Sequence, residues 1–243
     1  MPQGKRNARG GTATGDVSAF VRGLVWRLGG GLQEVYCLKC DVSKYFESID
    51  HKVLLYLIQK KIADRDTLWL IEKIIRSSNE ATGKGIPIGN LTSQLFANIT
   101  LNALDQYMKH ILRERYYIRY MDDFVVLGAN KRHLHRVRES VEAFLLDVLH
   151  LRLHPKKAQI FPAREGIDFL GYRVYGTHRL LRKSTVKRFV KRTRGFQKNV
   201  AGGRIKEEVL HRSVQSWAAY AKHANSWRLR SQLEEILKVP LIK

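Results

Sequence analysis

The spacing of apolar and polar positions predicts strands and helices in an irregular order. Residues 35–42 alternate in the manner of a strand rich in β-forming side chains. From about 51 to 77 the apolar positions recur every three to four residues, which predicts one helix with Ser48 or Asp50 as its N-cap. Gly and Pro then punctuate a loop over residues 83–89.

Beyond that loop, helical periodicity returns over 93–113 and over 131–149. Short β-rich runs also occur, at Tyr116–Tyr120, Phe124–Gly128, Gln159–Phe161 and Asp168–Tyr175. The first two of these runs flank Met121-Asp122-Asp123, which is typical of a tight hairpin. From Leu181 onward the pattern is helical. Strands interleaved irregularly with helices favour an α+β fold over a doubly wound α/β sheet.

Composition narrows the class of protein. The chain has 243 residues, 44% of them hydrophobic, which is too apolar for intrinsic disorder. Its formal charge of +22 makes a polyanion, and therefore nucleic acid, the expected partner. No apolar run reaches the roughly 18 residues that a membrane span needs, and two cysteines exclude a disulfide scaffold. We therefore expect a soluble, cytoplasmic protein with no membrane partner.

A basic run near the C-terminus has no acidic residue. Its eight cations are Arg182, Lys183, Lys187, Arg188, Lys191, Arg192, Arg194 and Lys198. Such a run can be a solvated helix face, but here the cations fall on nearly every side of the helix, and Trp217, Tyr220 and Trp227 follow. We therefore favour a surface that grips a phosphate backbone.

Three carboxylates lie next to apolar strands, where burying an acidic side chain should cost folding free energy. Asp41 ends the first apolar strand, and Asp122 and Asp123 occupy the expected hairpin. An arginine could neutralise any one of them, but three carboxylates converging from two strands suit divalent metal, and oxygen ligands suit Mg²⁺. Adjacent strand residues point to opposite faces, so we expect Asp122 to join Asp41 at the metals and Asp123 to be more peripheral.

A second motif, Cys37-Leu38-Lys39-Cys40, has C-x-x-C spacing. We do not interpret it as a zinc or redox site, because the chain has no second Cys pair and positions i and i+3 of a strand face opposite sides.

Several motifs in order resemble those of reverse transcriptases. Tyr120-Met121-Asp122-Asp123 resembles their YxDD box, and Asp41–Phe46 resembles their first palm motif. Residues 85–94 fill the place of the family's Gln-Gly-x-x-x-Ser-Pro segment, and 153–157 resemble its lysine-bearing motif. Residues Phe169, Leu170, Gly171 and Tyr172 resemble the family's primer grip.

The resemblance implies an RNA-directed DNA polymerase. Such an enzyme would use two Mg²⁺, with Mn²⁺ as a possible substitute, an RNA template, a nucleic-acid primer and deoxynucleoside triphosphates. The implied fold is a right-hand palm, with an antiparallel sheet and helices on one face, plus a mostly helical thumb. We expect residual fingers over 1–34, a palm over 35–178 and a basic helical thumb over 179–243.

The resemblance also implies roles for single residues. Phe46 matches the aromatic that packs against the incoming sugar, although it could equally be a core residue. Lys157 matches the lysine that protonates the leaving pyrophosphate, although it could be a solvated lysine. Gly89, Ser93 and Gln94 would lie near the template or base pair, with N-capping the simpler explanation for Ser93.

One departure from the family pattern points to a subtype. Ile88 stands where most reverse transcriptases have Gln, and Gln94 where they have Pro. This form resembles the enzymes of diversity-generating retroelements, in bacterial or phage-encoded systems, which copy a template with frequent errors opposite adenine during mutagenic retrohoming. Such enzymes act with a small basic accessory protein that forms a barrel-like oligomer. The alternatives are a group II intron-like reverse transcriptase and a catalytically silent, truncated RNA-binding palm and thumb.

The N-terminal segment is shorter than the fingers of reverse transcriptases. Only 34 residues precede Val35, and they resemble the last part of that region. Lys5, Arg6 and Arg9 lie there in a Gly-rich context. We expect the chain to be a fragment, a shortened reading frame or the product of a different start assignment.

Overall fold

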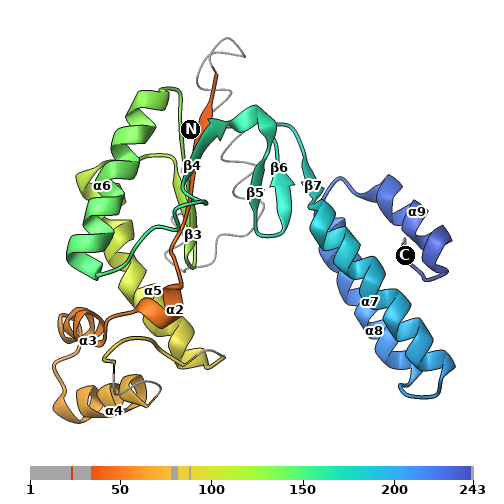
Figure 1. Cartoon of the computed structure of the whole chain (residues 1–243), viewed down its shortest axis with the longest axis horizontal. Helices are drawn as coiled ribbons and strands as arrows, with labels where there is room; N and C mark the ends of the chain where they lie inside the picture. Colours follow the sequence, from red (N-terminus) through yellow and green to blue (C-terminus); the bar gives the residue numbers. More distant parts are fainter. Residues whose placement is uncertain (1–22, 24–33, 78–81, 88, 242–243) are drawn as a thin grey trace, which may run out of the picture. The chain divides into compact units, whose positions relative to one another are not determined.

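The computed structural model describes residues 23, 34–77, 82–87 and 89–241 (Figure 1). Nearly all of the expected fingers segment 1–34, and Ile88, lie outside these residues. The chain divides into two compact units at Ala163/Arg164, fifteen residues before the expected boundary between palm and thumb.

The first unit contains a four-stranded antiparallel sheet with strand order β2-β3-β1-β4. Its strands are β1 (Tyr36–Asp41), β2 (Tyr117–Tyr120), β3 (Asp123–Gly128) and β4 (Gln159–Pro162). Alternation over 35–42 and three of the short β-rich runs predicted all four strands within two residues. The expected α+β class with antiparallel sheets is therefore confirmed.

The helices of the first unit are α2 (Tyr45–Ser48), α3 (His51–Gln59), α4 (Arg65–Arg76), α5 (Leu91–Gln106), a π-helical turn η1 (Tyr107–Ile111) and α6 (Lys131–Leu149). The single helix expected over 51–77 is wrong, because residues 60–64 separate α3 from α4. The Asp64 carboxylate accepts a hydrogen bond from the Thr67 amide at 2.8 Å and starts a new helix. Asp50, one of the two expected caps, caps α3 by accepting from the Lys52 amide at 2.9 Å.

The core of the first unit lies between the sheet and the helices on one of its faces. Leu38 and Cys40 of β1, with Phe124 of β3, point toward this core and are fully buried. Helices α5 and α6 cover them, with Leu101 and Leu145 among the buried contacts (Figure 1). Truncating a buried leucine to alanine typically costs about 2–5 kcal/mol, so this packing anchors the sheet whose strand ends carry the acidic residues.

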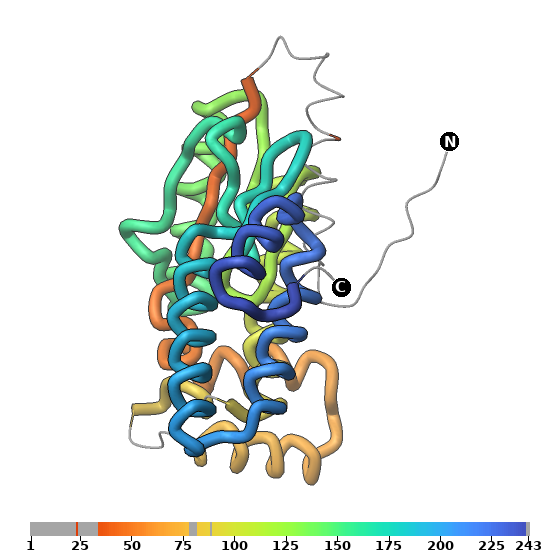
Figure 2. The backbone as a smooth tube through the Cα atoms, turned by 90° about the vertical axis from the view of Figure 1, so that its right-hand side faces the viewer, coloured from red at the N-terminus to blue at the C-terminus, as the bar shows by residue number. Residues whose placement is uncertain are grey.

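The second unit combines a small sheet with a helical hairpin. After the 3₁₀ turn η2 (Ala163–Glu165), it contains β5 (Ile167–Phe169), β6 (Tyr172–Val174), β7 (Arg179–Leu181), α7 (Lys183–Ala201), α8 (Glu207–Lys222) and α9 (Trp227–Leu237). Strand β7 was not expected, because three residues are too few to show a period. Helices α7 and α8 run side by side (Figure 2). Between them Phe189 stacks on Trp217 with ring centroids 3.8 Å apart, so Trp217 is a core residue rather than part of a nucleic-acid surface.

No helix within the described ranges combines the length and the apolar character needed to cross a bilayer.

Candidate active site

The register of β1 and β3 brings two of the predicted carboxylates together. Asp41, the last residue of β1, pairs with Asp123, the first residue of β3. Directly opposite residues of an antiparallel pair project from the same face, with Cβ atoms roughly 4.5–5.5 Å apart. The backbone therefore makes Asp123, expected to be the more peripheral acid, the cross-strand neighbour of Asp41.

Two lysines neutralise this pair of acids. Lys157 Nζ lies 2.9 Å from Asp41 Oδ2, and Lys39 Nζ lies 3.3 Å from Asp123 Oδ2. Lys39 is two residues before Asp41 and shares its strand face. Because like charges directly opposite each other destabilise a sheet, these ammonium groups offset the cost of the acidic pair. Lys157 was expected at this site from its motif, whereas Lys39 was not singled out by the sequence.

Asp122 lies in the two-residue turn that joins β2 to β3. Its backbone carbonyl accepts a hydrogen bond from the Val42 amide at 3.3 Å, which ties the turn to the residue that follows Asp41. Burial is the main cause that raises the pKa of Asp122; the negative charge of Asp41 raises it further, and Lys157 opposes the shift. The negative charge of Asp41 therefore acts on the carboxyl group of Asp122, and the joint role of these two acids at a metal stays a prediction.

These donors have the chemistry that Mg²⁺ prefers, since carboxylate oxygens are hard ligands. The site already attracts cations, because two lysine ammonium groups lie against the acids. Within the described part of the chain, however, no three His, Cys, Asp or Glu side chains are gathered in a group that could hold a metal. The acids face their lysines instead, and the assignment of Asp41, Asp122 and Asp123 as metal ligands stays a prediction.

A partly buried network of hydrogen bonds on the other face of the sheet holds the turn, and the sequence analysis did not predict it. Arg119 of β2 forms a two-pronged ion pair with Asp105 of α5, from Nε to Oδ1 at 2.8 Å and from Nη2 to Oδ2 at 2.6 Å. Its Nη1 donates to the backbone carbonyl of Met121 at 2.9 Å. Tyr117 also donates to Asp105, at 2.7 Å. An arginine within an apolar strand was the signal available, because a buried charge needs a partner.

Met121, the first residue of the turn, has a positive φ of 53°. This region costs a non-glycine residue roughly 1–2 kcal/mol. The hydrogen bond from Arg119 to the Met121 carbonyl stabilises the turn in this conformation. The tip that presents Asp122 is therefore held from the helix side of the sheet.

The loop after Thr82 is attached to the segment that follows Asp41. The amide of Ile86 donates to the carbonyl of Phe46 at 2.9 Å, and that of Gly85 donates to Ile49 at 2.8 Å. The ring of the buried His51 makes a hydrogen bond with the Gly85 carbonyl at 2.6 Å. Phe46 itself is half-buried against the core. Part of its ring therefore packs as a core residue, which was the alternative to its contact with the incoming sugar.

The start of α5 corrects one expectation. The N-cap of α5 is Asn90, so the capping role considered for Ser93 is wrong. Ser93 is 1% exposed, and its side chain faces the interior of the unit. Gln94 and Gly89 are exposed, and Gly89 has a φ of 102°, which favours glycine. Of the three, Gln94 is the side chain that remains open to a template.

In the second unit the predicted primer-grip residues form a hairpin. Phe169 pairs with Tyr172, and Leu170 and Gly171, with φ of 49° and 85°, make the two-residue turn. Positive φ at both positions is typical of a type I′ turn. A Cβ at Gly171 would overlap the hydroxyl of Tyr220 on α8, which explains why glycine is needed there. The contact of this hairpin with a primer stays a prediction.

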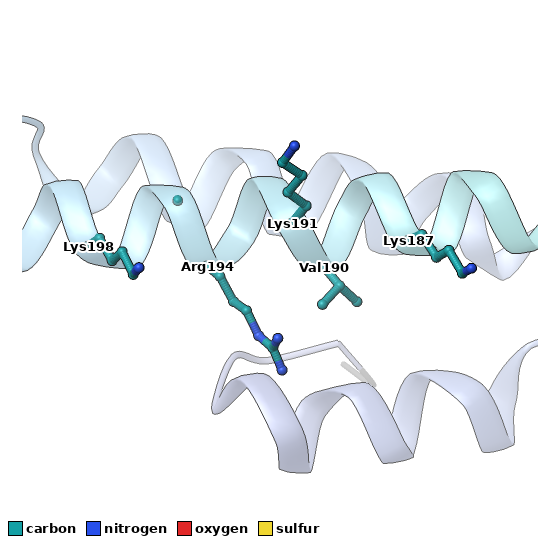
Figure 3. A pocket seen from close by; sticks show the side chains of 6 residues that line it. Lys187, Val190, Lys191, Arg194 and Lys198 are labelled. Atoms are coloured by element: carbon teal, nitrogen blue, oxygen red, sulfur yellow. The ribbon is translucent and has the colours of Figure 1, made fainter.

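Helix α7 presents its cations on two sides of a buried stripe. Phe189 and Thr193 are buried, whereas the cations of α7 from Lys183 to Lys198 are exposed. Arg182 is half-buried and occupies the N-cap position without a side-chain capping bond, and its Nε lies 3.5 Å from Asp168 Oδ1. A cavity of about 510 Å³ is lined by Lys187, Val190, Lys191, Arg194, Gly195 and Lys198. Figure 3 shows Val190 and Arg194 pointing toward the neighbouring helix and Lys191 pointing away from it.

The two cysteines are buried on opposite faces of β1, opposite Leu127 and Phe124 respectively. Burial raises the pKa of Cys40 to about 12 and raises that of Cys37 well above its usual range. Both thiols are therefore protonated at neutral pH and are poor metal ligands or nucleophiles.

Comparison with known proteins agrees with this geometry. Residues 24–174 match the family described as reverse transcriptase (RNA-dependent DNA polymerase). Protein YkfC of Escherichia coli is 28% identical over 61% of this chain, and a putative COX1/OXI3 intron 2 protein of Saccharomyces cerevisiae is 23% identical over 57%. The chain spans 47% and 24% of these two relatives, less than half of their length.

The fold also matches solved polymerase structures. The telomerase of Candida tropicalis, solved with a fragment of telomeric RNA, superposes on 92% of this chain and 46% of its own, with a TM-score of 0.55 and 15% identity. That likeness shows a shared fold, including a partial palm and thumb. The family match covers well over half of the chain and includes both acidic motifs and the hairpin between β2 and β3. The chain belongs to the reverse transcriptase family.

Proposed function

We propose that this chain is the palm and thumb of an RNA-directed DNA polymerase that copies an RNA template into cDNA. The observation that carries the proposal is the register that pairs Asp41 with Asp123 beside the turn that holds Asp122. Family membership supports the same reading, and members of the family use divalent metal ions.

The ligands in this proposal are the three carboxylates of the strand ends. Asp41, Asp122 and Asp123 would hold two Mg²⁺, for which Mn²⁺ could substitute. When bound, such a pair of ions lowers the pKa of the primer 3′-hydroxyl and stabilises the leaving pyrophosphate. Before metal enters, Lys39 and Lys157 neutralise the acids, so loading requires these ammonium groups to be displaced or shared.

Lys157 is the best-placed proton donor for the leaving group. Its Nζ lies against Asp41 and is half-exposed, so it remains accessible to a bound triphosphate. A proton held on Nζ can pass to the pyrophosphate oxygen as the bond to the α-phosphate breaks. Phe46 and Gln94 would contact the nucleotide and the template from the segment after β1 and from α5.

Nucleic acid would be gripped by the second unit. The exposed cations of α7, among them Lys187, Arg188, Lys191 and Arg192, would neutralise backbone phosphates, and the turn at Leu170-Gly171 would contact the primer. Release of counterions makes such binding steeply dependent on salt.

We further propose the diversity-generating subtype, in which the enzyme is error-prone opposite template adenine and acts with a basic accessory oligomer. The segment Ile88-Gly89 to Ser93-Gln94 supports it. A glutamine at position 88 could hydrogen-bond the sugar or backbone near the nascent pair, whereas isoleucine can only pack, so geometric discrimination weakens. A group II intron-like reverse transcriptase is the nearest alternative.

Primer extension on an RNA template with Mg²⁺ tests the polymerase. We expect Asp122→Asn to reduce extension at least 10³-fold, because removing a metal ligand removes transition-state stabilisation. Asp147→Asn, an exposed acid on α6, is the matched control and should extend normally. Full extension by Asp122→Asn would contradict the proposal. RNA binding that persists in EDTA, with no extension in Mg²⁺ or Mn²⁺, would instead support the silent RNA-binding module.

Sequencing of the cDNA tests the subtype. Ile88→Gln should lower misincorporation opposite template adenine more than opposite the other three bases. An unchanged error spectrum would argue for the intron-like alternative.

A further inference from the structure

Helices α3 and α4 repeat one unusual pattern on their surfaces. Each carries a cation, an aromatic and a second cation at positions i, i+4 and i+8. The α3 stripe is Lys52–Tyr56–Lys60, in which Lys60 is the C-cap residue directly after the helix, and the α4 stripe is Arg65–Trp69–Lys73. Residues four apart lie on the same helix face, so each ring is bracketed by two cations. All six side chains are exposed, and Tyr56 and Trp69 are each 58% exposed.

The rings and the ammonium groups are in direct contact. Lys60 Nζ lies 4.2 Å from the centroid of the Tyr56 ring, and Lys73 Nζ lies 4.2 Å from that of Trp69. A hollow of about 340 Å³ adjoins the α3 stripe and is completed by Val53 and Leu57 of α3, Ala103 of α5 and Val148 of α6, among others. Its volume lies at the small end of the roughly 300–1,000 Å³ of small-molecule pockets, so it suits a flat group rather than a folded partner.

The core does not explain these aromatic rings. Leu54 and Ile58 of α3, and Ile75 of α4, are buried and attach the two helices to the first unit. The stripes lie away from those contacts, so Tyr56 and Trp69 add little apolar burial to the fold. Large aromatics that stay exposed beside cations point to a ligand that offers both negative charge and flat rings.

The charge of this region favours a polyanion. Residues 51–77 contain six Lys or Arg and three Asp or Glu. Two of the acids are already engaged, since Asp64 caps α4 and Glu72 pairs with Arg76 at 2.7 Å. Among the described residues no ion pair is recorded for the stripe cations. A basic partner protein would be repelled here, and an acidic protein would supply no bases to stack.

We propose that the two stripes form a platform for single-stranded RNA, which rests on the proposed function in taking RNA as the template. Bases stack on Tyr56 and Trp69, and phosphates pair with the flanking cations. We commit to RNA rather than DNA because the template extends as a single strand beyond the copied duplex, whereas the product is made paired. The platform is thus a second grip on the template, built on the first unit and distinct from α7.

Binding of a fluorescent 15-nucleotide oligo(U) to the full chain in EDTA tests this platform. The variant Tyr56→Leu/Trp69→Leu should weaken binding at least tenfold, since each base–aromatic stack typically contributes about 1–3 kcal/mol. Lys60→Gln/Lys73→Gln should lower the slope of log K against log salt by about 1.4, from roughly 0.7 for each phosphate contact on a single strand. Circular dichroism should show that both variants are folded.

Matched controls separate stacking from surface hydrophobicity. Leu70→Ala and Leu146→Ala remove apolar side chains that are 53% and 46% exposed outside the stripes, and they should leave the affinity within twofold of wild type. An oligo(U) that contains 4-thiouridine should cross-link to the peptide 51–77, and Trp69→Leu should reduce that adduct. Cross-links confined to the second unit, or an aromatic double variant that binds like wild type, would overturn the platform.

Two further arms test the chemistry of the partner. Polyglutamate of equal charge should compete at least tenfold less well than oligo(U), because it cannot stack; equal competition would point to an acidic protein and overturn the proposal. Oligo(dU) binding tenfold tighter than oligo(U) would overturn the commitment to RNA. Asp122→Asn should keep the stripe-dependent binding while losing extension, so failure of the platform and failure of the polymerase remain distinguishable.

Discussion

Two hairpins of this protein have two-residue turns but are stabilised by different interactions. The hairpin of β2 and β3 and the hairpin of β5 and β6 each turn over two residues, and each has a bulky residue at positive φ first, Met121 in one and Leu170 in the other. Charged groups hold the first hairpin, through Arg119 and Asp105. Glycine and aromatic packing hold the second, in which the Tyr172 and Tyr220 rings pack at a tilt of 35° with their centroids 4.7 Å apart.

The difference follows from what each tip presents. The first tip presents carboxylates, so its surroundings need buried and paired cations to keep it in place. Burial raises the pKa of Tyr172 and that of Tyr220, so the two rings that pack beside the second turn stay uncharged at physiological pH. The tip that presents acids is thus fixed by ion pairs, whereas the tip at Leu170-Gly171 is fixed by the packing of glycine against an aromatic side chain.

The largest effect is expected at the charged hairpin. Arg119→Met leaves Asp105 half-buried without its main partner, which should lower the free energy of unfolding by about 3–5 kcal/mol. It should also reduce extension by roughly 10² or more, because the turn that holds Asp122 loses its support. Urea denaturation and primer extension measure the two effects.

The matched control for that variant is Arg76→Gln, which breaks an exposed i,i+4 pair with Glu72 and should cost only about 0.3–0.5 kcal/mol. Combining Arg119→Met with Asp105→Leu should restore part of the stability without restoring extension. A loss from Arg119→Met as small as that from Arg76→Gln would show that charge does not hold this hairpin.

The next effect is expected at the aromatic hairpin. Gly171→Ala should destabilise the second unit by about 2 kcal/mol, because alanine is strained at a φ of 85° and its Cβ would overlap the Tyr220 hydroxyl. Adding Tyr220→Phe should recover the part caused by overlap. Gly203→Ala, at a φ of 69° with open space around it, isolates the backbone strain and should cost less. Equal costs for Gly171→Ala and Gly203→Ala in thermal denaturation would exclude the overlap.

A smaller effect, with opposite sign, is expected for Asp122→Asn in EDTA. Burial and the charge of Asp41 raise the pKa of this carboxyl in the folded state, so its ionised form costs stability above that pKa. The folded protein binds the proton more tightly, and stability therefore falls as pH rises through the folded pKa. The variant should melt at a higher temperature than wild type at pH 7, and the gain should vanish below the pKa of the unfolded chain.

Asp168→Asn in the second hairpin is the comparison for this pH experiment. Asp168 pairs with Arg182 at 3.5 Å and is about half-exposed, so its loss should slightly lower the melting temperature at pH 7. A higher melting temperature for both variants would mean that the loss of any negative charge stabilises the protein, whatever the environment of Asp122.

The smallest effect is expected for Leu170→Asn. Asn-Gly is the preferred pair for a type I′ turn, so the substitution should stabilise the second hairpin by up to about 0.5 kcal/mol, measured by urea denaturation. Asparagine at Met121 should bring no comparable gain, because Arg119 already holds that turn. A larger gain at Met121 would contradict the view that the charged network sets its conformation.

Much of this architecture was predictable from local patterns. Alternation located β1, a β-rich run located β3, and periodicity located α6 at its observed bounds. The break between α3 and α4 was missed because a single capping side chain, Asp64, overrides a continuous apolar period. Strand β7 was missed because its three residues pair only with a partner that is itself short.

The charges around the site could not be read in the same way. Lys39 meets Asp123 across 84 positions, and Lys157 meets Asp41 across 116, so both pairs depend on the tertiary fold rather than on local sequence. Asp105 was hidden for the same reason, since it lies on a helix 14 positions before Arg119. Of Lys39, Lys157 and Asp105, only Lys157 was predicted to have a functional role, because only its motif resembles a functional motif of the family.

The lysines beside Asp41 and Asp123 have a consequence for folding. Since each of these acids already has a counter-ion within the chain, the acidic strand ends reach their folded arrangement without an added cation.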